Sequence, residues 1–155
     1  MTGVQTCALP IFLSRKGNVE RGRELFFKSA GLQCATCHRV GGTGSTLGPD
    51  LSDIGKKSTR AQILESILDP SKDIDPKFAA YLAETDDGRT FLGLLVSKDA
   101  KEVVLRDTQG QVTRLPAAKV TVLEASKKSL MPEGLLRDLT LQQAADLIAF
   151  LESLK

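Results

Sequence analysis

Residues 34–38 read CATCH, and they carry the most specific chemistry in this sequence. Two thiols three positions apart can each form a thioether with a vinyl group of one porphyrin, and the adjacent histidine can offer a ring nitrogen to its iron. The spacing therefore predicts one covalently attached c-type haem, bound through Cys34 and Cys37 and ligated by His38.

Two other interpretations of CATCH compete less well. A zinc site needs four ligands, and beyond these three residues the chain offers only Cys7 and carboxylates. The plainer interpretation is a buried pair of cysteines beside a surface histidine. It does not explain why three fixed residues coincide in so short a chain.

The second axial ligand follows largely by elimination. His38 is the only histidine, so bis-histidine ligation is excluded, and the two methionines are Met1 and Met131. Met131 is followed by Pro132 and Gly134, which predict an irregular loop suited to presenting a thioether. We therefore expect Met131 to be the ligand. A neutral thioether raises the reduction potential, and an iron with both axial positions filled favours electron transfer over oxygen activation.

A haem-ligating histidine usually donates its other ring N–H to a fixed acceptor. Pro49 lies eleven residues after His38, beyond a glycine-rich stretch, and proline stiffens the backbone that carries its carbonyl. We expect the Pro49 carbonyl to be that acceptor. The glycine-rich stretch itself, residues 41–48, is expected to be a flexible loop without secondary structure. It lacks the Lys-Ser/Thr ending of a phosphate-binding loop.

Composition is that of an ordinary globular protein. The chain has 155 residues, of which 41% are hydrophobic and 26% charged, with a formal net charge of +2. This length fits one domain, or one domain with an insertion. The near-neutral charge gives no case for nucleic-acid or membrane binding, and no apolar run is long enough to span a bilayer.

The N-terminal residues need separate treatment. Residues 2–11 read TGVQTCALPI, which looks like the translation of a common sequencing adapter. We therefore expect residues 1–16 to be artefactual or disordered, with native sequence beginning near Phe12 and the upstream part lost. The competing interpretation is the tail of a signal peptide, but the stretch lacks a basic n-region and an A-x-A cleavage site.

Local patterns predict the elements that position the site. Helical spacing and capping residues predict helices over residues 19–30, from Thr59 to Pro70, and over 141–154. From about Phe78 the period changes to that of short strands, expected at 78–85, 90–97, 102–106, 111–115 and 120–125. Asp87-Gly88 predicts a hairpin turn.

These elements predict a mainly α fold. The haem domain would cover residues 17–155, with a small antiparallel β-meander inserted at about 78–125, before the loop that carries Met131. A packing or docking appendage is the favoured role for the meander over a second active site.

Several segments together resemble a known family. GRELF precedes CATCH, LGPDL follows it, and SLMPEGL precedes a closing ADLIAFL segment. This set resembles class I cytochrome c, and more narrowly the haem-binding domain at the C-terminus of large exported proteins of planctomycetes and verrucomicrobia. The resemblance implies that Gly22 and Phe26 cross the closing helix near Phe150. It also implies an upstream module, such as a β-propeller dehydrogenase, that supplies electrons.

The predicted function is electron transfer through one c-type haem with His38 and Met131 as axial ligands, in a domain that is not an enzyme by itself. The expected partner is a redox protein or the upstream dehydrogenase module. Covalent haem attachment in bacteria follows export, so a periplasmic or exported location is expected. The alternatives are a haem-based sensor or docking module and, less favoured, a peroxidase, for which no distal histidine is present.

Overall fold

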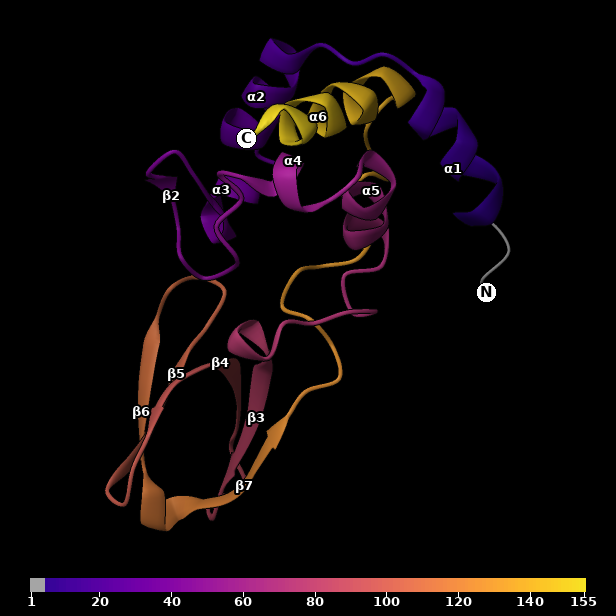
Figure 1. Cartoon of the computed structure of the whole chain (residues 1–155). Helices are drawn as coiled ribbons and strands as arrows, with labels where there is room; N and C mark the ends of the chain where they lie inside the picture. Colours follow the sequence, from indigo (N-terminus) through magenta and orange to yellow (C-terminus); the bar gives the residue numbers. More distant parts are fainter. Residues whose placement is uncertain (1–4) are drawn as a thin grey trace. The chain divides into compact units, whose positions relative to one another are not determined.

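The computed structural model describes residues 5–155, with side chains from residue 10 onward, and the chain divides into two compact units (Figure 1). Unit 1 combines Met1–Pro70 with Glu133–Lys155, and unit 2 is Ser71–Pro132. Unit 1 is therefore assembled from two stretches of chain that unit 2 separates in sequence.

The described part of unit 1 is helical apart from one short ladder. Its helices are α1 (Gln5–Ser14), α2 (Val19–Lys28), α3 (Cys34–Cys37), α4 (Ile54–Lys57), α5 (Arg60–Leu68) and α6 (Leu141–Ser153). Strands β1 (Arg39–Val40) and β2 (Thr43–Gly44) pair antiparallel. The expectation that residues 41–48 have no secondary structure was wrong, because Gly41 and Gly42 adopt positive φ and turn the chain back on itself.

The predicted capping residues begin the helices as expected. Thr59 and Thr140 each form a full capping box, with Gln62 and Gln143 respectively. The Asn18 side chain accepts the N–H of Arg21 at the start of α2. This helix ends at Lys28 with Ser29 as its C-cap, slightly before the predicted end.

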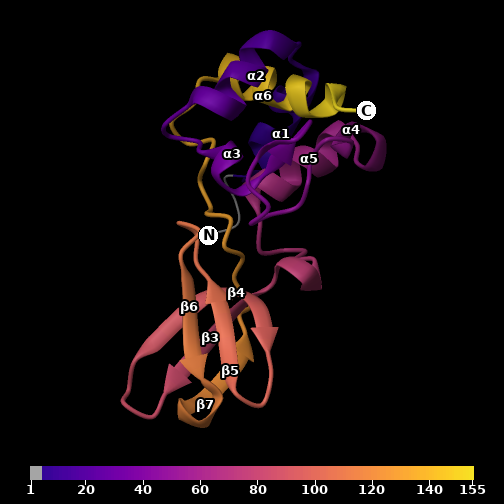
Figure 2. The same cartoon turned by 90° about the vertical axis from the view of Figure 1, so that its left-hand side faces the viewer.

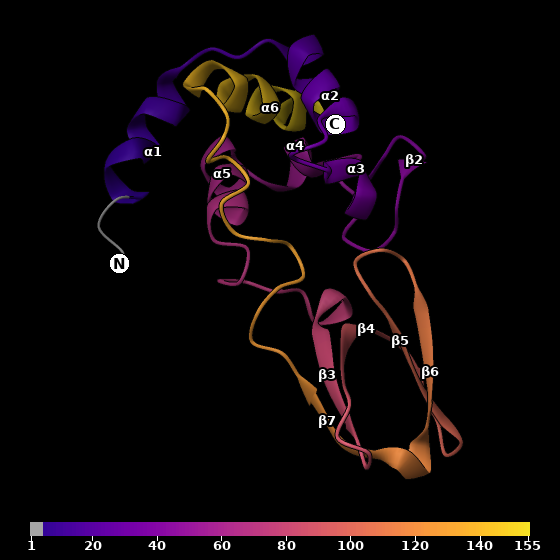
Figure 3. The same cartoon turned by 180° about the vertical axis from the view of Figure 1, so that it is seen from behind.

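Helices α2 and α6 cross at very close range (Figure 3). A Cβ built on Gly22 would overlap the carbonyl oxygen of Asp146 and lie 2.7 Å from the Cβ of Phe150. One turn later the Phe26 ring packs against Phe150, with 5.6 Å between ring centroids. The crossing that the family resemblance implied is confirmed, and it explains why a glycine stands in mid-helix.

A buried carboxylate fixes the start of α2 against α6. Asp146 is 2% exposed and accepts hydrogen bonds from the Asn18 N–H at 2.6 Å, from Arg21 Nε at 2.8 Å and from Gln142 Nε2 at 2.9 Å. Burial by itself would raise the pKa of this carboxyl, but these donors together outweigh it and lower the pKa. Sequence reasoning missed this residue, because it lies in a segment read only for its apolar positions.

The segment before α2 is held by hydrogen bonds from α5 and α6 of the same unit. Arg60 of α5 donates to the carbonyl oxygens of Phe12 and Arg15, and Gln142 of α6 donates to that of Lys16. A Cβ on Gly17 would overlap the Ala145 carbonyl oxygen. The artefactual or disordered origin of residues 1–16 stays a prediction.

Unit 2 is a five-stranded antiparallel sheet with a curled form (Figure 2). Its strands are β3 (Ala80–Thr85), β4 (Thr90–Lys98), β5 (Glu102–Arg106), β6 (Val112–Pro116) and β7 (Val120–Ala125), with 3₁₀ turns η1 (Pro76–Phe78) and η2 (Ala117–Lys119). These strand ranges agree closely with the predicted ones. Asp87-Gly88 forms the β3–β4 turn, with Gly88 at φ +81°.

The strand order shows that unit 2 is more than a meander. The order is β6-β5-β4-β3-β7, so β7 pairs with β3 at the edge opposite β6. Because only the three residues of η2 join β6 to β7, the sheet has to curl. Its inner face holds a core of its own, formed by Ala83, Val103, Leu105 and Leu115.

The prediction of a mainly α fold was therefore wrong. The structure has 35% helix and 25% strand, with the five-stranded sheet as a major component. The strands themselves were read correctly from local pattern. The share of the fold that they form was underestimated. The pairing of β7 with β3 is a long-range contact that gives the insertion its own core, and local pattern cannot show it.

Replacing Gly22 with alanine should destabilise unit 1. The added methyl would meet the Asp146 carbonyl of a rigid helix, so we expect a loss of about 1–3 kcal/mol in the free energy of unfolding, measured by denaturant titration. Gly31→Ala is the matched control, because nothing lies within 4 Å of a Cβ at Gly31. Equal stability of the two variants would contradict the close crossing.

Replacing Asp146 with asparagine should change how stability depends on pH. The lowered pKa means that the carboxylate stabilises the fold above about pH 4 and loses this contribution as the pH falls through the folded-state value. We expect Asp146→Asn to cost about 1–3 kcal/mol at neutral pH and progressively less in acid. Thermal unfolding at several pH values would measure this gap. The exposed Asp138→Asn variant is the control for removing one surface carboxylate.

Candidate functional site

The CATCH residues form one helical turn and the residue that ends it. Cys34 and Cys37 are the first and last residues of α3, so both thiols lie on neighbouring sides of a single turn. His38 is the C-cap and donates its backbone N–H to the Cys34 carbonyl at 2.8 Å. Gln33 precedes the turn with φ +51° and redirects the chain from α2 into α3.

The His38 ring is held by Pro49. Its Nδ1 lies 2.8 Å from the Pro49 carbonyl oxygen, which is the contact expected from the sequence. A carbonyl can only accept, so Nδ1 carries the proton and Nε2 is left with a free lone pair. Burial lowers the pKa of the ring, and the hydrogen bond to Pro49 raises it by less. A neutral imidazole with Nε2 free is the form that binds iron.

The glycine-rich segment wraps closely around this turn. Ser45 donates its N–H to the Ala35 carbonyl at 3.1 Å, and Gly48 donates to that of Cys37 at 2.7 Å. A Cβ on Gly48 would lie 2.9 Å from His38 Cε1 and 3.1 Å from Nδ1. The bare backbone at Gly48 therefore lets the loop pass beside the imidazole. Sequence reasoning missed this role, although its signal is the glycine directly before Pro49.

The surroundings of Cys34 and Cys37 set the protonation state of their thiols. Burial raises the pKa of Cys34 to about 11 and raises that of Cys37 as well, so both are protonated at neutral pH. Both are free cysteines. Thioether formation adds S–H across a vinyl group: sulfur bonds to one carbon and the hydrogen goes to the other. A protonated thiol supplies both partners of that addition.

These observations fit a c-type haem and do not fit zinc. Cys34 and Cys37 would hold the porphyrin, and His38 Nε2 would bind its iron. Among the side chains that the structure describes, those of residues 10–155, no group of three or more His, Cys, Asp or Glu is placed to hold a metal ion by itself. The zinc interpretation therefore gains no support from the geometry.

Met131 lies near the end of unit 2, after β7. Its side chain is half-buried, and its backbone N–H is donated to Ser129 Oγ at 3.1 Å. His38 belongs to unit 1 and Met131 to unit 2, so ligation of the iron by Met131 stays a prediction.

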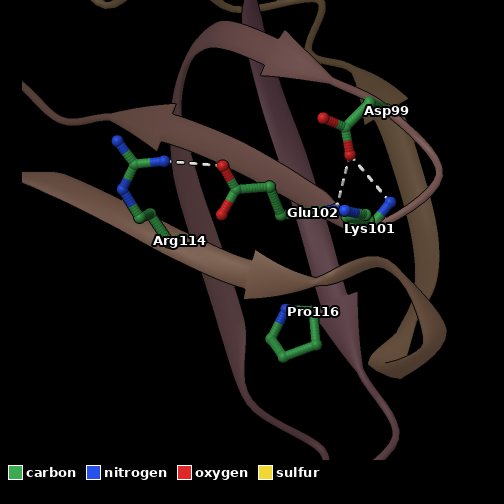
Figure 4. Close-up of a pocket in the computed structure, with 5 residues that line it drawn as sticks. All are labelled: Asp99, Lys101, Glu102, Arg114 and Pro116. Atoms are coloured by element: carbon green, nitrogen blue, oxygen red, sulfur yellow. Dashed lines mark hydrogen bonds and ion pairs between the residues drawn. The ribbon is translucent and has the colours of Figure 1, made fainter.

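A pocket on the sheet of unit 2 is lined by polar residues that satisfy one another (Figure 4). Arg114 and Glu102 form a cross-strand ion pair at 2.6 Å, and the Asp99 carboxylate accepts the N–H groups of Lys101 and Glu102. These contacts close the β4–β5 turn and brace the sheet. The pocket shows no second chemical site.

Comparison with known families decides the identity of this arrangement. The model of the cytochrome c family matches residues 19–155, which includes the CATCH turn, unit 2 and α6. The chain belongs to the cytochrome c family. Membership implies a covalently bound c-type haem, electron transfer and an interaction with a redox partner.

No curated protein matches this cytochrome c chain. Among the helices that the structure describes, none is both long enough and apolar enough to cross a membrane.

Replacing Gly48 with alanine should disturb the haem-binding histidine. The methyl would press on the imidazole, so we expect the His38–Pro49 hydrogen bond to lengthen and the yield of covalently loaded protein to fall by about tenfold or more. The ratio of haem absorbance to protein measures this. Gly31→Ala, a glycine in open space near CATCH, should load normally. Normal loading of both variants would contradict the role of Gly48.

Proposed function

We propose that this cytochrome c domain transfers electrons through a single haem with His38 and Met131 as axial ligands. The observation that carries the proposal is the CATCH turn with His38 Nδ1 bonded to Pro49. It supplies two attachment points and one imidazole nitrogen in the correct tautomer. The chain has one such motif and one histidine, which supports a single haem.

The residues of the chain have distinct tasks in this proposal. Cys34 and Cys37 hold the haem in one orientation for the lifetime of the protein. The Pro49 carbonyl accepts a hydrogen bond from the Nδ1–H group of His38. This bond fixes the plane of the imidazole and increases electron donation from Nε2. When bound, the haem iron supplies the one-electron redox chemistry. The rest of unit 1 keeps the site rigid, which lowers the reorganisation that accompanies electron transfer.

The second axial ligand rests on the choice of donors in the chain. Met131 is the methionine within the described residues, and Met1 lies outside them. A His/Met pair would place the reduction potential toward the high end of the cytochrome range and leave no open position for oxygen. Pro132 follows directly and ends backbone hydrogen bonding at that point.

The wider setting follows from the narrower resemblance. We propose that the domain is of the type that ends large exported proteins of planctomycetes and verrucomicrobia. It would relay electrons from an upstream oxidoreductase module to a soluble or membrane-bound acceptor. Export into the bacterial periplasm would precede haem attachment.

Visible and near-infrared spectroscopy of the haem-loaded protein tests the ligand assignment. The reduced protein should show the α-band of a c-type haem, and the oxidised protein a weak near-infrared S–Fe band. Met131→Leu keeps the side-chain volume but removes the sulfur, so we expect this band to vanish and the reduction potential to fall. A spectrum unchanged by Met131→Leu would overturn the assignment.

Two alternative functions give different results in the same preparation. A gas sensor would bind carbon monoxide near stoichiometrically in the reduced state without mutation. A peroxidase would turn over peroxide, although the chain has no distal histidine to act as acid–base catalyst. Neither activity is expected of a haem whose two axial positions are filled.

A further inference from the structure

We propose that Ser71 and Ser129 are positioning residues that hold the Met131 segment in place. The inference rests on the proposed function, because it assigns these serines to the presentation of the axial methionine. Ser129 begins the SLMPEGL segment, but no role was predicted for either serine from the sequence. The evidence is a short chain of hydrogen bonds at the end of unit 2.

The hydrogen bonds run from one end of unit 2 to the other. Ser71 Oγ accepts the backbone N–H of Ser129 at 3.1 Å, and Ser129 Oγ accepts the backbone N–H of Met131 at 3.1 Å. Ser71 is the first residue of unit 2, and Met131 is the last but one. The two serines therefore link the first residue of unit 2 to its last residues, beside Met131.

Regular structure does not fix this segment. Strand β7 ends at Ala125, and the last backbone bond to the sheet is from Ser126 N–H to the Ala80 carbonyl. Beyond that point the backbone N–H groups of Lys128, Ser129 and Met131 are donated to serine hydroxyls. Pro132 has no backbone N–H to donate. Serine hydroxyls thus accept backbone N–H groups here, as strand carbonyls do within the sheet, and those of Ser71 and Ser129 lie nearest to Met131.

The partial burial of these hydrogen bonds increases their contribution to holding the segment. Ser71, Ser129 and Met131 are all half-buried, so water competes for the donors less than it would at an exposed turn. An axial methionine leaves the iron when its backbone segment moves away. Holding that segment would lower the population of the open state, in which Met131 is away from the iron. Exogenous ligands would reach the iron only in that state.

The chain provides a matched control. Ser126 Oγ accepts the N–H of Lys128 at 3.1 Å, which is the same serine-to-backbone bond, two residues apart, as that of Ser129 to Met131. This bond is exposed, whereas the two bonds of Ser71 and Ser129 are partly buried, and Ser126 lies five residues before the methionine. Loss of this bond should affect the chain locally without releasing Met131.

The experiment measures the imidazole affinity of the oxidised, haem-loaded full chain, together with its near-infrared S–Fe band. Ser71→Ala and Ser129→Ala should each raise the imidazole affinity by about twofold to tenfold, because each removes one hydrogen bond that favours the closed state. Ser126→Ala should match the wild type. Ser129→Thr keeps the hydroxyl and should restore most of the wild-type affinity.

The outcomes separate this inference from the proposed function. If Met131→Leu abolishes the S–Fe band but both alanine variants bind imidazole like Ser126→Ala, the positioning role is wrong and the ligand assignment stands. If Met131→Leu leaves the spectrum unchanged, the ligand assignment fails and takes the positioning role with it. Haem content and thermal unfolding of each variant show whether a change in affinity reflects general loss of structure.

Discussion

The contact between α2 and α6 is the constraint on which unit 1 depends. Two helices can approach so closely only if one of them lacks a side chain at the crossing, and Gly22 provides this. The approach brings Asp146 to the start of α2, where its carboxylate accepts hydrogen bonds from three donors. It also packs the ring of Phe26 at a tilt against that of Phe150. Helix α2 then delivers the chain to Gln33 and α3 in one fixed direction.

The haem-binding turn has little stability of its own. Helix α3 has four residues, which is too short to persist without support. Support comes from backbone bonds to Ser45 and Gly48 and from the His38–Pro49 bond. The glycine-rich segment thus braces the attachment turn through backbone bonds, and the missing side chain of Gly48 lets it pass beside the imidazole.

Much of this architecture could be predicted from the sequence because its signals are local. Capping boxes at Thr59 and Thr140, the period of the strands and the Asp87-Gly88 turn all act within a few residues, and each was found where predicted. The Pro49 acceptor followed from the chemistry of a ligating histidine. The burial of Asp146 and the pairing of β7 with β3 depend on residues distant in sequence, and no local pattern reports them. The weight of the sheet in the fold was misjudged for the same reason.

The Asn18–Asp146 hydrogen bond joins residues 128 positions apart. Contacts of that sequence separation make folding slow, because the chain has to close a very long loop before any contact rewards it. Unit 2 has its own core, and the Ser71–Ser129 bond ties its ends together. Once unit 2 has folded, most of that loop is already compact, and the search that brings α6 to α2 involves only the short connections on either side. The insertion that separates the two halves of unit 1 in sequence thereby shortens the loop that has to close when α6 meets α2.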